Sequence, residues 1–171
     1  MTDPDLSPEP GWLVEPRRDQ SRRSRSFVSG DPEGDRIRIA YYRHPESGDR
    51  VGKVWFGPGA EGPPSHAHGG AVAAVLDEAM GTNAWLRGHA VLAGTLTIRY
   101  RAPTPLERVF TVHTRLASVE GRRILATSTL VGPDGTVHAE GEGIFVVMRP
   151  EQRAWVAEEA ARLGRPTPDA Y

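Results

Sequence analysis

The sequence predicts an α+β fold in which an antiparallel sheet packs against one long helix. Six segments are rich in β-branched residues and are bounded by Gly or Pro turns, which is the pattern of short strands. One segment, residues 70–86, instead has a helical pattern. It follows two of the strands and precedes the other four, so strands and helices do not alternate and a parallel sheet is not expected.

Chain length and composition predict one domain with additional ends. The chain has 171 residues, 38% of them hydrophobic and 25% charged, which suits a single globular core. We expect residues 1–30, rich in Pro and Arg, to form a flexible arm, residues 31–149 the domain, and residues 150–171 a peripheral helix and tail. Residues 12–14 are apolar enough to dock on the body. The arginines between Arg17 and Arg25 are typical of a solvated tail or of a phosphate-binding cluster.

The strands are predicted from alternation and from turn residues. Residues 36–41 and 51–56 alternate polar with apolar side chains around a turn at 46–49, so they should pair. Four more strands, which we expect to form an antiparallel meander, are residues 94–100, 109–119, 122–131 and 136–148. One helix covers only part of such a sheet, so burial against a second copy of the chain is expected, giving a homodimer or a dimer of dimers.

The overall charge and the residue types exclude several classes of function. A net charge of −1 provides no field that would attract nucleic acid or an anionic membrane. The chain has no cysteine, so it has no thiolate nucleophile and no zinc-thiolate site. We expect no membrane span and no secretory leader, and therefore a cytoplasmic protein.

The segment that precedes the long helix carries the first chemical signal. Gly69 and Gly70 allow a tight turn, and the first N–H groups of a helix have no acceptor within it. The helix dipole adds positive potential at that point. Such amides can stabilise an oxyanion, and losing one donor of this kind costs on the order of a hundred- to a thousandfold in rate.

The second signal is Asp77, eight residues after Gly69 on the same helix. Its helix face is otherwise made of small or apolar residues: Gly70, Ala73, Ala74, Met80, Gly81 and Ala84. A carboxylate on such a face is either partly buried or held at a subunit interface, where desolvation raises its pKa. The alternative is that Asp77 faces solvent beside Glu78, as most helical acids do.

Two histidines and two arginines have competing interpretations. His68 is placed to satisfy backbone groups at the helix start, while His66 is either exposed or part of a site. Both histidines with Asp77 would suggest a metal site, but a third ligand is missing. Arg99 and Arg101 share one face of a strand and could meet phosphates, or simply face solvent.

The order of these motifs resembles a known family. The His68-Gly69-Gly70 tripeptide, the small-residue helix with Asp77, and residues 97–103 together resemble the hot-dog acyl-CoA thioesterases, particularly their phenylacetate-pathway and thioesterase-superfamily-member branch. The resemblance extends over residues 37–148. It implies a sheet wrapped around one helix, a catalytic carboxylate at Asp77, a carbonyl-polarising N–H at Gly69, and an active site between two protomers. No cofactor or metal is implied.

The chain departs from that family at two positions. Several relatives have Asn where this chain has Gly62, and Ser65 or His66 would then have to supply the missing polar group. Relatives also often carry Ser or Thr where this chain has Ala93, and Thr95 is the nearest hydroxyl. The catalytic candidates are Asp77, Gly69, Gly70, His68 and Thr95. The substrate-binding candidates are His66, Gly62, Ser65, Arg99 and Arg101.

These observations predict hydrolysis of an acyl thioester, with acyl-CoA as the expected substrate. Asp77 would activate water or attack the carbonyl directly. Two alternatives remain open. A dehydratase or hydratase with the same fold would pair His66 or His68 with Asp77, and a non-catalytic acyl-CoA-binding protein would explain the departures at Gly62 and Ala93.

Overall fold

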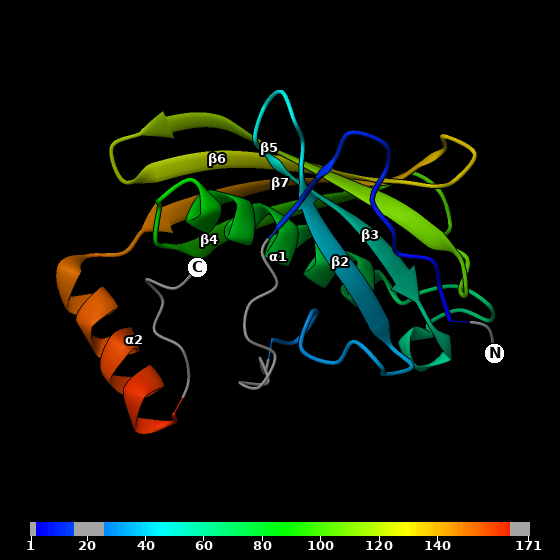
Figure 1. Ribbon diagram of the computed structural model, residues 1–171, viewed down its shortest axis with the longest axis horizontal. Helices are drawn as coiled ribbons and strands as arrows, with labels where there is room; N and C mark the ends of the chain where they lie inside the picture. Colours follow the sequence, from blue (N-terminus) through cyan, green and yellow to red (C-terminus); the bar gives the residue numbers. More distant parts are fainter. Residues whose placement is uncertain (1–2, 16–25, 165–171) are drawn as a thin grey trace.

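The computed structural model describes residues 3–15 and 26–164 and contains one long helix against one sheet (Figure 1). The helices are α1 (Gly69–Leu86), α2 (Pro150–Arg162) and a short 3-10 turn (Pro58–Ala60). The strands are β1 (Leu13–Val14), β2 (Ile37–Arg43), β3 (Arg50–Phe56), β4 (Val91–Tyr100), β5 (Val109–Glu120), β6 (Arg123–Val131) and β7 (Val137–Val147). The predicted α+β class, the long helix and the six main strands are therefore confirmed.

All seven strands form a single antiparallel sheet in the order β1-β2-β3-β5-β6-β7-β4. The predicted meander is correct for β5, β6 and β7 but wrong for β4, which pairs with β7 and not with β5. The reason is the helix that comes before it. Its 18 residues span about 27 Å, so α1 carries the chain across the sheet and delivers β4 to the far edge.

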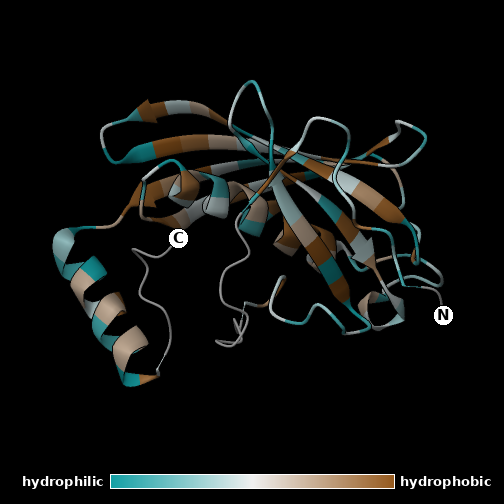
Figure 2. Cartoon of the chain, viewed as in Figure 1, coloured by the Kyte–Doolittle hydropathy of each residue, from teal (hydrophilic) through white to brown (hydrophobic). Residues whose placement is uncertain are grey.

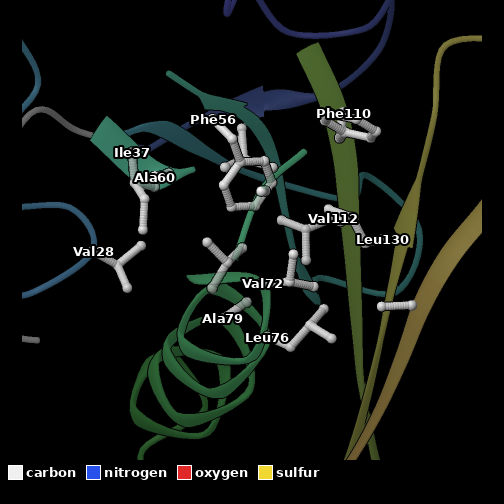
Figure 3. Packing of buried hydrophobic residues seen from close by; sticks show 14 residues of the cluster. Val28, Ile37, Phe56, Ala60, Val72, Leu76, Ala79, Phe110, Val112 and Leu130 are labelled. Atoms are coloured by element: carbon white, nitrogen blue, oxygen red, sulfur yellow. The ribbon is translucent and has the colours of Figure 1, made fainter. Parts of the chain in front are cut away.

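The core lies between α1 and the inner face of the sheet (Figure 3). Val72, Leu76 and Ala79 on α1 pack toward Phe110 and Val112 of β5, and all of them are almost completely buried. Burying an aliphatic or aromatic side chain of this size contributes roughly 1.5–3 kcal/mol. The helix is thereby held against the sheet along its length.

Part of the predicted arm packs on the domain. Val28 is buried in the core, and residues 3–15 lie along the outer face of the first strands. The Trp12 ring lies 5.8 Å from that of Tyr42, whose hydroxyl donates to the Leu6 carbonyl at 2.5 Å. Glu15 forms an ion pair with Arg50. The arginine cluster falls within residues 16–25, outside the described residues.

The two edges of the sheet differ. The β1 edge is only two residues long, whereas β4 presents ten residues, most of them exposed. Helix α2 extends away from the sheet, and Figure 2 shows both polar and apolar positions along it. It begins at Pro150, earlier than its apolar residues suggest, because proline suits the first helical position and Gln152 caps the Arg149 N–H. In the described ranges, neither helix combines the length and apolar character needed to cross a bilayer.

Candidate active site

The start of α1 presents one free amide. His68 is the N-cap, in extended conformation, and its Nδ1 accepts a hydrogen bond of 2.9 Å from the Gly70 N–H. The neutral ring therefore carries its proton on Nε2. No acceptor for the Gly69 N–H occurs among the described residues, and the Tyr100 hydroxyl donates to the Gly69 carbonyl at 2.8 Å. Of the two glycines, Gly69 is thus the one with an N–H available to a ligand.

The loop before α1 is held by backbone hydrogen bonds from both sides. The His68 N–H donates to the Ala60 carbonyl at 2.8 Å, and the Ala67 N–H donates to the Thr104 carbonyl at 2.8 Å. A hollow of about 450 Å³ opens in front of this loop. Its lining includes Gly69, His66, Tyr100 and Arg101. Gly69 therefore lies at the wall of a cavity large enough for part of a ligand.

Asp77 lies farther along α1 and is half-buried, next to a second hollow of about 210 Å³. Burial raises the pKa of its carboxyl, and the neighbouring Glu78 carboxylate raises it further. No hydrogen bond or ion pair joins Asp77 to any other described residue. Glu78, by contrast, accepts from the Tyr41 hydroxyl at 3.3 Å and from the Ser26 hydroxyl. The two adjacent acids thus differ: Glu78 has partners, whereas Asp77 has none within the part of the chain that the structure describes.

Gly69 and Asp77 do not meet within one chain. Eight residues of helix separate them, which is a rise of about 12 Å. The two hollows lie at opposite ends of β4: Tyr100 and Arg101 line the first, whereas Val91 and Leu92 line the second. A single thioester carbonyl cannot contact both groups of the same protomer.

The remaining candidates near the helix start have mainly structural contacts. The Nδ1 of His66 lies 2.9 Å from the Pro64 carbonyl, and the Ser65 N–H donates to the Glu61 carboxylate at 2.8 Å. Ser65 has a positive φ of 63°. A Cβ on Gly62 would lie 2.8 Å from the Cα of His68. This contact explains the glycine at position 62, where no side chain fits without a shift of the backbone.

The candidates on β4 are only partly brought to the site. Leu96 and Ile98 pack against the core on the α1 side of the sheet. Because side chains alternate along a strand, Thr95 lies on the opposite face, and it is exposed. Arg99 lies opposite Glu140 in the β4–β7 ladder. Arg101 lines the first hollow and forms an ion pair of 2.6 Å with the same glutamate.

Sequence reasoning missed two aromatic residues at the site. Tyr100 was part of the recognised motif, but its hydrogen bond to Gly69 depends on contact between distant parts of the chain. Trp85 lines the hollow beside Asp77 and is eight residues away on the same helix, a spacing that could have indicated it. No group of three His, Asp or Glu side chains in the described ranges is arranged to hold a metal.

Both the fold and one segment of the chain have known relatives. Residues 65–138, which run from the loop before α1 into β7, match the family model described as Thioesterase superfamily. This segment is therefore similar to that superfamily, and the chain has the hot-dog fold.

Individual relatives agree with this similarity. The chain is 29% identical over 137 residues to the acyl-coenzyme A thioesterase THEM4 of Mus musculus, a match covering 80% of this chain and 59% of the relative. It therefore spans about three-fifths of that relative, and 52% of the corresponding protein of Bos taurus.

Solved structures give the same result. The thioesterase superfamily protein RHA08564 superposes with a TM-score of 0.61 at 33% identity, covering 64% of this chain and 53% of that one. The BH2602 protein of Bacillus halodurans, solved with CoA, superposes with a TM-score of 0.53 at 25% identity, covering 57% of this chain and 66% of that one.

Proposed function

We propose that this protein hydrolyses acyl thioesters, with the Gly69 N–H of one protomer binding the carbonyl oxygen and Asp77 of a second protomer driving the attack. Two observations on one helix carry the proposal: among the described residues, the helix-start amide has no acceptor and the half-buried carboxylate has no hydrogen-bond or ion-pair partner. Both occur in the segment that is similar to the thioesterase superfamily.

The chemistry needs only these two kinds of group. The amide and the helix dipole stabilise the negative charge that develops on the carbonyl oxygen. In one route, Asp77 accepts a proton from water while the water oxygen bonds to the carbonyl carbon. In the other, the Asp77 carboxylate attacks the carbonyl carbon itself and forms an anhydride, which water then hydrolyses. The C–S bond breaks, the sulfur takes up a proton, and the products are a carboxylic acid and a thiol.

The distance between Gly69 and Asp77 supports a dimeric site. Two antiparallel helices related by a twofold axis bring Asp77 of each chain beside Gly69 of the other, with the axis near the midpoint at Ala73. The small residues Gly70, Ala73 and Ala74 allow two helices to approach closely there. The free β4 edge offers unpaired backbone groups that a second β4 can complete, which would extend the sheet across the dimer. Assembly of two such dimers into a tetramer is also proposed.

Coenzyme A is the proposed thiol. The curated relatives named above are acyl-coenzyme A thioesterases, and the BH2602 structure contains CoA. In this chain, Arg101, which follows β4, contributes a guanidinium group to the lining of the first hollow, suited to phosphate contacts. Arg99 lies opposite Glu140 in the β4–β7 ladder and is not part of that lining.

The test is thiol release from acyl-CoA substrates by the protein and its Asp77→Asn variant. We expect the variant to lose on the order of a thousandfold or more in kcat, because its amide cannot accept the proton. Glu78→Gln is the matched control, since that carboxylate is bound by Tyr41 and Ser26, and it should retain turnover within a few-fold. Full activity of Asp77→Asn would contradict the proposal.

Stability provides a second readout on the same variant. Because the folded-state pKa of Asp77 is raised, its charged form disfavours folding at pH values above that pKa. Asp77→Asn should therefore increase Tm at pH 7, and the gain should disappear as the pH falls below the unfolded-state pKa. If Asp77→Asn loses activity while its Tm rises, the lost activity is due to the missing carboxylate and not to misfolding.

The contacts of the two histidines support a hydratase less well than a hydrolase. His68 uses Nδ1 to cap Gly70, and the Nδ1 of His66 is close to a backbone carbonyl. A crotonyl thioester distinguishes the reactions: a hydrolase releases thiol, whereas a hydratase adds water without releasing it. Saturable binding of every acyl-CoA tested, without either reaction, would instead indicate a binding protein.

A further inference from the structure

The hollow beside Asp77 is built along one face of α1. Three residues on this face follow one another at intervals of four and therefore lie one above the other on the helix: Asp77, Gly81 and Trp85. Val91 and Leu92 of β4 and Phe145 of β7 form the opposite wall. Glu78 and Thr82 also contribute to the lining next to Asp77, and the rest of the hollow is apolar.

Trp85 closes the far end of this face and is held in place. Its Nε1–H donates to the Val91 carbonyl at 3.3 Å, and its ring packs against the second core cluster, which includes Met80 and Phe145. Gly81 keeps the middle of the face open. A Cβ at that position would lie 3.3 Å from a ring carbon of Phe145.

We propose that this hollow holds the acyl group of the substrate, and that Trp85 and Gly81 limit its size. The inference rests on the proposed function. A carbonyl carbon attacked at Asp77 lies within about 3.5 Å of the attacking oxygen, so the acyl group must begin at this carboxylate. The first hollow is the larger one and has Arg101 in its lining, which suits the charged coenzyme arm and leaves the smaller hollow beside Asp77 to the acyl group.

The volume indicates the class of acyl group. An apolar cavity of about 150 Å³ is sufficient to bind benzene. The hollow measures about 210 Å³, which accommodates one aromatic ring or a short aliphatic chain. A long unbranched chain would have to pass the indole of Trp85. The substrate class is therefore a short-chain or single-ring acyl thioester.

The experiment measures kcat/KM for acetyl-, benzoyl- and decanoyl-CoA by thiol release. The kcat/KM of the protein itself should be at least about tenfold higher for benzoyl-CoA than for decanoyl-CoA. Tenfold is the lower end of the discrimination that an apolar pocket makes by size. Trp85→Ala should raise the decanoyl-to-benzoyl ratio at least about tenfold. Gly81→Ala should do the opposite and lower benzoyl activity while acetyl activity stays within a few-fold.

Two further variants control for folding and for general effects of removing an indole. Trp155→Ala removes an indole that is 63% exposed on α2 and should leave all three rates unchanged. Trp85→Phe retains an aromatic ring in the core cluster and should shift the ratio in the same direction as alanine, but less. If Trp85→Ala does not fold, the phenylalanine variant still tests the proposal.

The failure of this inference is distinguishable from failure of the proposed function. Efficient decanoyl-CoA hydrolysis by the unmodified protein, or an unchanged ratio in folded Trp85 variants, would overturn the acyl assignment and leave hydrolysis intact. Absence of thiol release from all three substrates would overturn the proposed function itself, and the inference with it.

Discussion

The hollow at the start of α1 and the hollow beside Asp77 differ in what they offer a substrate. The first measures about 450 Å³ and contains the free Gly69 amide together with Tyr100 and Arg101. The second measures about 210 Å³ and is lined by the Asp77 and Glu78 carboxylates, Thr82 and apolar side chains. One can stabilise negative charge, and the other can supply a base or nucleophile.

Each chain thus has two unlike groups on one helix, and they cannot act on one carbonyl within the chain because about 12 Å separates them. In the proposed twofold dimer, each group would lie beside its complement from the other protomer, and two identical sites would form.

After the loss expected for Asp77→Asn, the largest effect is expected at the helix-start amide. Gly69→Pro removes the N–H at the first helical position, where proline is well accepted, and His68 already has the extended conformation that precedes proline. We expect kcat to fall on the order of a hundred- to a thousandfold. Gly69→Ala keeps the N–H and adds a Cβ 3.2 Å from the Tyr100 hydroxyl, so it should lose far less. Equal losses in both variants would indicate crowding rather than loss of a donor.

Mixing two inactive variants tests whether the halves come from different chains. In a dimer of Asp77→Asn with Gly69→Pro, one site combines both defects and the other has neither. Half of randomly reassorted dimers are mixed, so about a quarter of the original rate should return. The measurement is thiol release after dissociation and reassociation of the mixture. No recovery, despite mixed dimers detected by mass spectrometry, would place both groups in one chain.

The pH dependence tests the environment of the second hollow. kcat/KM should fall as the pH decreases through the raised pKa of Asp77, since the protonated carboxyl cannot accept a proton. Glu78→Gln removes one of the two causes of the raised pKa, so this acid limb should move to lower pH. It should stay above the ordinary value of 3.8, because burial persists. If the acid limb of kcat/KM stays at the same pH in Glu78→Gln, Glu78 does not raise the pKa of Asp77.

The smallest effect concerns the loop of the first hollow. Gly62→Asn restores the residue of several relatives, but its Cβ meets the His68 backbone at 2.8 Å. The free energy of unfolding should fall by about 1–3 kcal/mol, measured in urea. Gly121→Asn is the control, because its φ of 58° suits asparagine and nothing lies within 4 Å of the added Cβ. An unchanged stability in Gly62→Asn would show that the loop adapts.

Local patterns predicted the elements well. The helix was expected over residues 70–86 and spans Gly69–Leu86, because its periodicity and the two glycines before it are properties of neighbouring residues. The pairing of β4 was predicted incorrectly, since it depends on how far the helix carries the chain. Thr95 was proposed as a hydroxyl near the site, but the packing of Leu96 and Ile98 turns it to the other face of the sheet.

The residue pattern alone establishes the α+β class, the helix with its glycine start, and the carboxylate eight residues along it. Which of these groups have partners follows from how the chain packs. His68 accepts from the Gly70 amide and Glu78 accepts from Tyr41 and Ser26, whereas Gly69 N–H and Asp77 have no partner in residues 3–15 and 26–164. The physical reason is that periodicity is encoded locally, whereas the partners of Glu78 come from 37 and 52 residues away and depend on the packed sheet.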